Sequence, residues 1–74
     1  MRLRRIFARN LRSFREAAGL SQEDLADAAD IDRTYVSALE RERYSASLDT
    51  IERVAAALSV EPKRLLDATN VEPD

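Results

Sequence analysis

The first pattern in the chain lies within its first 18 residues, where hydrophobic side chains recur every three or four positions. These positions are Leu3, Phe7, Leu11, Phe14 and Ala18. This spacing is typical of an amphipathic helix that buries one face. Gly19, the chain's single glycine, follows where a helix end favours a left-handed residue, and Leu20 supplies the accompanying apolar contact. The sequence therefore predicts a first helix that stops at Gly19.

A second helix is predicted from Ser21 onward. Ser21 is a favoured N-cap residue, and Asp24 three positions later completes a capping-box pattern. The expected buried stripe of this helix consists of Leu25, Ala28 and Ala29. The helix is expected to end at Asp30, because Asp adopts the left-handed backbone of a turn more readily than most residues with a side chain. Ile31 is expected to fill the turn.

A third helix is predicted from residue 33 to about residue 41, with Asp32 as its N-cap. Val36 and Leu39 lie three positions apart and form its inward face. The positions left to face outward or sideways are Arg33, Thr34, Tyr35, Ser37 and Ala38. A polar loop over residues 42–46 is expected to follow.

Two further helices are predicted in the second half of the chain. Ser47 caps the fourth, whose apolar residues are Leu48, Ile51, Val54, Ala55 and Leu58. Pro62 suits the first turn of a short fifth helix, and Leu65 and Leu66 give that helix an apolar side. Residues 69–74 are expected to fray. Because no strand-like alternation or internal repeat occurs, the sequence predicts an all-α fold of five helices in a single domain, residues 1–74.

Composition limits the chemistry of this domain. The chain has 74 residues with neither cysteine nor histidine, which removes disulfides, zinc sites built from these residues and the usual catalytic nucleophile and base pairs. We therefore expect no enzyme activity, no metal and no cofactor. No apolar run reaches the roughly 18 residues of a membrane span, and no signal peptide is recognisable, so we expect a cytoplasmic protein. A domain this small buries only about 60% of its unfolded surface, which favours a partner subunit.

The formal net charge of −2 argues against a nucleic-acid partner, but the charges are unevenly distributed. Residues 1–15 contain six arginines and no acid, whereas residues 16–40 contain seven acids and a single basic residue, Arg33. Such a distribution can give a basic face for phosphate groups and an acidic back. The alternative is an ordinary solvated helix surface.

Four runs of the sequence resemble the Cro/C1-type (Xre) helix-turn-helix family. They are Ser-Gln-Glu-Asp-Leu-Ala at residues 21–26, Asp-Arg-Thr-Tyr-Val-Ser at 32–37, Leu-Glu-Arg at 39–41 and Ser-Leu-Asp-Thr-Ile at 47–51. The resemblance extends over about residues 5–67, and the matching positions outside these runs are Phe7, Leu11, Phe14, Arg15, Gly19 and Ile31. It implies a five-helix, lambda-repressor-like domain in which residues 21–41 form the helix-turn-helix. It also implies a transcriptional regulator that binds double-stranded DNA.

Within that family, the short chain and residues 32–35 are similar to the controller proteins of restriction-modification systems. Such controllers are small dimeric regulators that bind operators upstream of their own gene, and no small-molecule effector is evident here. Prophage-type repressors, and antitoxins that bind a protein toxin and regulate their own gene, share much of the pattern and are the alternative. An enzyme built on the acids between residues 23 and 32 is a weaker alternative, because helix caps and solubility explain those acids.

The resemblance implies that the third helix enters the major groove through its N-terminal residues. Arg33 is expected to read a guanine, because its planar guanidinium can donate to O6 and N7 together. The other expected base-reading residues are Thr34, Tyr35 and Ser37. The structural alternatives are a solvated Arg33 and a Tyr35 that packs partly into the core.

Contacts to the DNA backbone are expected from two places. Gln22 resembles the glutamine with which family members clamp a phosphate, the alternative being an exposed glutamine at a helix start. The residues expected to contact the backbone around the loop after the third helix are Arg41, Arg43, Tyr44, Ser45 and Ser47. Asp30 and Glu42 depart from the family, because glycine is frequent at both positions. Glu42 also puts a negative charge near the expected phosphate path.

Two further sets of residues have expected structural roles. Arg15 and Glu40 match a pair with which family members hold the third helix, so we expect an ion pair and assign Glu40 no catalytic role. The candidate homodimer interface is Val60, Leu65 and Leu66, because a short terminal helix cannot bury two leucines alone; the alternative is that they cap the core. A symmetric dimer sets its recognition helices about 34 Å apart and requires a pseudo-palindromic operator.

Overall fold

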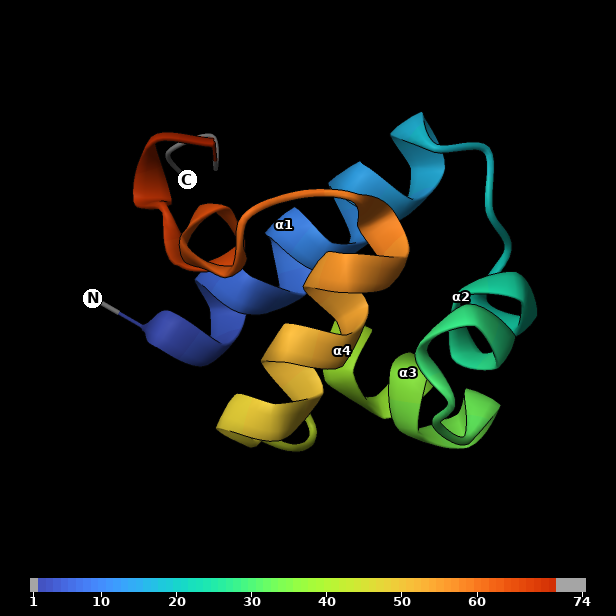
Figure 1. The fold of residues 1–74 in the computed structure, drawn as a ribbon. Helices are drawn as coiled ribbons and strands as arrows, with labels where there is room; N and C mark the ends of the chain where they lie inside the picture. Colours follow the sequence, from blue (N-terminus) through green and yellow to red (C-terminus); the bar gives the residue numbers. More distant parts are fainter. Residues whose placement is uncertain (1, 71–74) are drawn as a thin grey trace.

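The computed structural model describes residues 2–70, which form four α-helices followed by two short 3-10 turns (Figure 1). The elements in chain order are α1 (Leu3–Ala17), α2 (Gln22–Ala29), α3 (Arg33–Glu40), α4 (Leu48–Leu58), η1 (Pro62–Leu66) and η2 (Ala68–Asn70). No strand occurs in this part of the chain. The predicted all-α class is confirmed, and α2 and α3 form the expected helix-turn-helix.

The short fifth helix predicted from the sequence is present at residues 62–66, but it is the 3-10 helix η1 and not an α-helix, so the count of five α-helices is wrong. The turn begins at Pro62, which has no N–H to donate, and the chain is already extended at Asp67. A segment this short commonly adopts the tighter 3-10 geometry. Of the tail predicted from residue 69, Thr69 and Asn70 belong to η2, and residues 71–74 lie outside the described residues.

Side chains cap α2, α3 and α4 at the residues that the sequence predicts. Ser21 Oγ accepts a hydrogen bond from the Asp24 N–H at 3.0 Å, and Asp24 Oδ2 accepts one from the Ser21 N–H at 3.1 Å. The second bond holds the pKa of Asp24 below its ordinary value. Ser47 Oγ likewise accepts from the Thr50 N–H at 3.0 Å, and Asp32 caps α3. These bonds satisfy amides that the first turn of a helix leaves unpaired.

The turns that follow α1 and α2 use the predicted residues. Gly19 adopts φ 75° and Asp30 adopts φ 57°, both in the left-handed region. The Ile31 N–H then donates to the Ala26 carbonyl at 3.0 Å, and the partly buried Ile31 side chain packs against the core. The short reversal between α2 and α3 therefore depends on a local backbone conformation that Asp tolerates.

The core is a single cluster formed by α1, α2, α3, α4 and η1. Its buried members are Phe7, Leu11, Leu25, Ala26, Ala29, Val36, Leu39, Ile51, Val54, Ala55, Leu58 and Leu65. The stripe predicted for α2 is wrong at one position, because Ala28 is exposed and Ala26 is buried. The reason is that α2 packs against both α3 and α4, which turns two adjacent positions, 25 and 26, inward.

A buried asparagine fastens η1 to α1. Asn10 is 1% exposed, and its Nδ2 donates to the carbonyl oxygens of Leu65 at 2.9 Å and Asp67 at 3.1 Å. Buried carbonyl groups need such donors, because they have lost their contact with water. Within the described chain the Oδ1 atom of Asn10 has no hydrogen-bond partner. This side chain therefore holds η1 and the residue that follows it against α1.

We expect Asn10→Ala to lower the free energy of unfolding by about 1–3 kcal/mol, because the buried Leu65 carbonyl loses a donor. Urea unfolding followed by circular dichroism measures this quantity. The exposed Ser13→Ala on the same helix is the matched control, with an expected change within about 0.5 kcal/mol. Equal unfolding curves for the two variants would contradict a clamping role for Asn10.

Candidate nucleic-acid interface

The first turn of α3 is fixed by its own N-cap. Asp32 Oδ1 accepts hydrogen bonds from the Thr34 N–H at 2.9 Å and from the Thr34 hydroxyl at 2.7 Å. The hydroxyl, followed by the amide, holds the pKa of Asp32 below its ordinary value, so the cap is ionised at neutral pH. Because the Thr34 hydroxyl already donates to Asp32, its methyl group and its oxygen lone pairs are what remain for a ligand.

The residues expected to read bases differ in how far their side chains are exposed. Arg33 is exposed at the first position of α3 and makes no hydrogen bond or ion pair with any residue from 2 to 70. Tyr35 is half-buried and packs against the core, and Ser37 is half-buried with its carbonyl accepting from the Arg41 N–H at 3.1 Å. The expectation that Ala38 faces outward or sideways is wrong: it is buried, because α3 packs on α1 as well as on α2.

Glu40, at the last position of α3, is the acceptor of a buried hydrogen-bond network. Arg15 donates from Nε to Oε2 at 2.7 Å and from Nη2 to Oε1 at 3.1 Å. The side chains of Arg15 and Glu40 are only 11% and 4% exposed. The hydrogen bond with Glu40 raises the pKa of Arg15 above its ordinary value. Arg15 Nη1 also donates to the Leu20 carbonyl at 2.8 Å, so one guanidinium connects α1, the following turn and α3.

Gln22 belongs to the same network. Its Nε2 donates to Glu40 Oε1 at 3.1 Å, and the side chain is half-buried at the first position of α2. The Glu40 carboxylate thus accepts three hydrogen bonds from two helices, which compensates much of the cost of burying its charge. The Gln22 amide is consequently held in one orientation at the positive end of α2.

The loop between α3 and α4 carries the remaining expected backbone contacts. Arg41, Arg43, Tyr44, Ser45 and Ser47 are all exposed. Ser47 is committed to capping α4, and Ser45 accepts from Arg4. Glu42 adopts φ 63°, the left-handed conformation in which glycine is unstrained, and pairs with Arg2 at 3.4 Å.

Arg2 and Arg4 were missed as candidate contacts, although both belong to the arginine-rich first 15 residues. Their side chains reach the loop from the N-cap position and the first turn of α1, across 40 and 41 positions of sequence. The signal available in the sequence was the run of basic residues without an acid. Periodicity alone could not show which of these arginines meet the loop.

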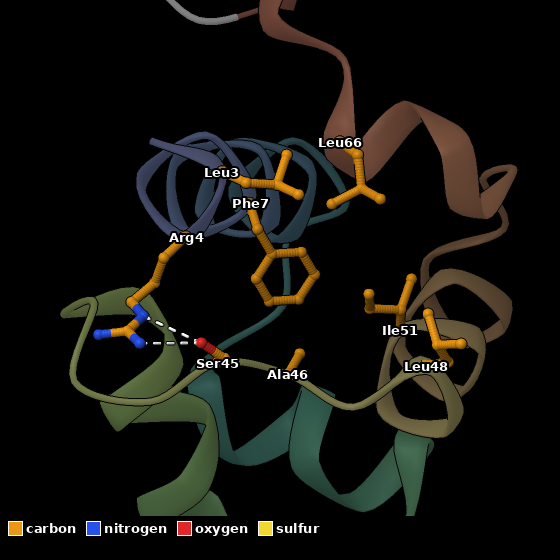
Figure 2. Close-up of a pocket in the computed structure, with 8 residues that line it drawn as sticks. All are labelled: Leu3, Arg4, Phe7, Ser45, Ala46, Leu48, Ile51 and Leu66. Carbon is orange, nitrogen blue, oxygen red and sulfur yellow. Dashed lines mark hydrogen bonds between the residues drawn. The ribbon is translucent and has the colours of Figure 1, made fainter. Parts of the chain in front are cut away.

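The residues predicted for a dimer interface do not form one exposed patch. Leu65 is 0% exposed within the protomer core, so the prediction that it forms an interface is wrong and the alternative of core capping describes it. Val60 and Leu66 are half-buried against the core. An apolar hollow of about 220 Å³ lies beside Leu66 (Figure 2), and its lining is Leu3, Arg4, Phe7, Ser45, Ala46, Leu48, Ile51 and Leu66.

Leu48 at the rim of this hollow is 79% exposed, although the sequence pattern places it among the apolar positions of α4. It is the first residue of α4 and lies beyond the end of the core. No helix in the described part of the chain is long and apolar enough to cross a membrane. Residues 2–70 also contain no cluster of three or more acidic side chains suited to a metal ion.

The sequence profile of the helix-turn-helix family HTH_3 matches residues 11–65. A hypothetical transcription factor from Neisseria meningitidis is 52% identical over 64 residues, which cover 86% of this chain and 60% of that relative's length. The control protein C.BamHI from Bacillus amyloliquefaciens is 43% identical over 70 residues, 93% of this chain and 86% of the relative. The crystal structure of the restriction-modification controller protein C.AhdI from Aeromonas hydrophila superposes with a TM-score of 0.81 at 44% identity, covering 84% of this chain and 94% of that one.

We expect Glu40→Ala to lower the free energy of unfolding by about 3–5 kcal/mol, because it leaves the Arg15 charge without its buried partner. Urea unfolding measures the loss, and the exposed Asp27→Ala on α2 is the control for removing an acid. The double replacement Arg15→Met with Glu40→Leu should recover a large part of the loss, since it leaves no unpaired charge. A loss for Glu40→Ala no larger than that for Asp27→Ala would contradict the buried ion pair.

Proposed function

The chain belongs to the HTH_3 helix-turn-helix family of Cro/C1-type transcriptional regulators, and from that premise we propose that it binds a pseudo-palindromic operator as a homodimer and controls the genes of a restriction-modification system. The observation that carries the proposal is the first turn of α3. Arg33 is exposed there without a partner among residues 2–70, on a helix whose other end is anchored through Glu40. Such a helix presents a guanidinium to the major groove at little cost in reorganisation.

Arg33 is the residue proposed to set base preference. Its guanidinium can donate two bonds to the O6 and N7 atoms of one guanine, and a bidentate contact of this kind discriminates by about 1–3 kcal/mol. Thr34 offers its methyl group to a thymine, because its hydroxyl hydrogen is already donated to Asp32. Tyr35 and Ser37 contribute at the wall of the groove, since both side chains remain partly exposed.

Phosphate contacts are proposed at two positions that flank α3. Gln22 lies at the start of α2 with its amide oriented by Glu40, beside backbone amides that the helix leaves free. On the other side, Arg41 and Arg43 are exposed in the loop that follows α3. These contacts fix the register of the recognition helix and do not read sequence.

The homodimer is proposed to form over the apolar hollow of Figure 2 instead of over Leu65. Leu48 exposes most of its side chain at the rim, and Leu66 and Leu3 are partly exposed beside it. An isolated 74-residue domain gains from covering such a patch, because its own core is small. A two-fold axis at this surface makes each copy cover the leucines of the other.

A link to restriction-modification genes is supported by two relatives, the restriction-modification controller protein C.AhdI at 44% identity and the control protein C.BamHI at 43% identity. Footprinting on the DNA upstream of the gene tests the operator directly. Protection of two symmetric half-sites, together with a neighbouring endonuclease gene, agrees with the proposal. A neighbouring toxin gene or phage integrase gene contradicts the assignment to restriction-modification while leaving the regulator role intact.

We expect Arg33→Ala to reduce the preference for operator over random DNA by roughly tenfold or more, because one bidentate guanine contact is lost. Fluorescence anisotropy with both duplexes measures this ratio. Arg43→Ala is the matched control, since it removes the same charge from a proposed phosphate contact and should weaken binding to both duplexes alike. An equal loss on both duplexes for Arg33→Ala would rule out its base-reading role.

We expect Leu48→Glu to shift the protein from dimer to monomer and to weaken operator binding, without unfolding it, because this side chain is almost fully exposed in the protomer. Sedimentation equilibrium measures the dissociation constant. The control is Ala17→Glu, which adds the same charge at an exposed position at the end of α1. The hollow is not the interface if both variants dimerise like the unmodified chain.

A further inference from the structure

A second, polar hollow lies where the first turn of α1 faces the loop between α3 and α4. Its volume is about 300 Å³, and its lining is Arg2, Leu3, Arg4, Glu42 and Ser45. Two guanidinium groups and one hydroxyl therefore share this hollow with a single carboxylate. These groups can bind an anion, which would compete with the Glu42 carboxylate for the arginine side chains.

Arg4 is oriented into this region by Ser45. Its Nε and Nη2 atoms donate to the same oxygen, Ser45 Oγ, at 3.1 Å and 2.9 Å (Figure 2). The fork of a guanidinium matches two oxygens of a phosphate or a carboxylate, whereas a neutral hydroxyl offers it one. Arg4 is thus pre-positioned on the loop without an anionic partner of its own among residues 2–70.

Glu42 supplies the one negative charge in the hollow, through its pair with Arg2. The two side chains meet at 3.4 Å, with Arg2 mostly exposed and Glu42 about one third exposed. Surface pairs of this kind contribute little stability, so a stronger anion can replace the carboxylate. Glu42 moreover holds a left-handed backbone conformation that costs a residue with a side chain more than it costs glycine.

The start of α1 adds to the positive potential at this position. Within the described chain, no side chain caps α1 and no acid lies in its first turn. The dipole of this 15-residue helix consequently places partial positive charge beside Arg4, where anions are stabilised.

We propose that this hollow, formed by Arg4 and Ser45, binds a phosphate of the DNA backbone, and that Glu42 weakens binding by competing with that phosphate for Arg2. The inference rests on the proposed function, because it needs α3 in the major groove. The C-terminal end of a recognition helix emerges at the DNA backbone, and the hollow adjoins the loop that leaves this end. The exposed Arg41 and Arg43 of the same loop extend the positive surface toward the strand.

The experiment measures the affinity of the full chain for operator and random duplexes over a series of salt concentrations. Arg4→Ala should weaken binding to both duplexes by about tenfold at 0.1 M salt, because a charge-assisted contact is lost. The slope of log K against log salt concentration should shrink by about 0.9, the change expected for one phosphate contact. Arg4→Lys, which keeps the charge, should retain the slope.

Two matched variants on the outer face of α1 distinguish the loss of a contact in the hollow from a change in the net charge of the protein. Arg12 pairs with Glu16 at 3.3 Å. Arg12→Ala therefore removes the same charge as Arg4→Ala, and Glu16→Gln neutralises the acid of an exposed ion pair as Glu42→Gln does. Glu42→Gln should strengthen binding severalfold and steepen the salt slope, because Arg2 is released to the phosphate. Arg12→Ala and Glu16→Gln should have clearly smaller effects.

The proposal is overturned if Arg4→Ala matches Arg12→Ala in affinity and slope, or if Glu42→Gln matches Glu16→Gln. Circular dichroism checks that the variants are folded, and sedimentation equilibrium checks that Arg4→Ala dimerises like the unmodified chain, because Arg4 also lines the apolar hollow proposed as the dimer interface. Failure of the unmodified chain to bind either duplex contradicts the proposed function itself, and the hollow with it. Normal binding, with specificity lost in Arg33→Ala and nothing lost in Arg4→Ala, contradicts the hollow alone.

Discussion

The buried carboxylate of Glu40 is the constraint on which the rest of this small domain depends. It accepts two hydrogen bonds from Arg15 and one from Gln22, so its charge is compensated by groups from α1 and α2. A charge buried this deeply is tolerated only when its partners stay in place. The ion pair therefore fixes the C-terminal end of α3 and orients the Gln22 amide with the same atoms. The opposite end of α3 is left free to carry Arg33.

Helix α1 stabilises the proposed DNA-binding surface through side chains along its whole length. Near its C-terminal end Arg15 holds α3, and in its first turn Arg4 holds the loop that follows α3. Asn10, between them, fastens η1 with hydrogen bonds from the same helix. The basic residues of the first 15 positions therefore stabilise different parts of the fold, Arg15 the helix α3 and Arg4 the loop that follows it. Their distribution, more than the net charge of −2, is what suits the protein to a polyanion.

The features that could be predicted from the sequence are local ones. The N-caps Ser21, Asp32 and Ser47, and the left-handed Asp30, each depend on a few neighbouring residues, and all four are found in the structure. What could not be predicted depends on tertiary packing. Periodicity does not show that α2 packs against two helices, which buries Ala26, or that Leu48 lies beyond the core. In the same way, only the fold reveals that Arg4 reaches Ser45 across 41 positions, and that the core takes up Leu65.

If the Arg15 and Glu40 pair holds α3 in place before DNA is bound, α3 should not open independently of the rest of the domain. Native-state hydrogen exchange of the free protein measures this at the Val36 amide, which donates to the Asp32 carbonyl, and at the amide of Leu39. We expect both amides to exchange only through global unfolding, with an opening free energy equal to that of the core amides of α1. Opening of α3 at a free energy about 2 kcal/mol or more below the global value would contradict a recognition helix that is preorganised by this pair.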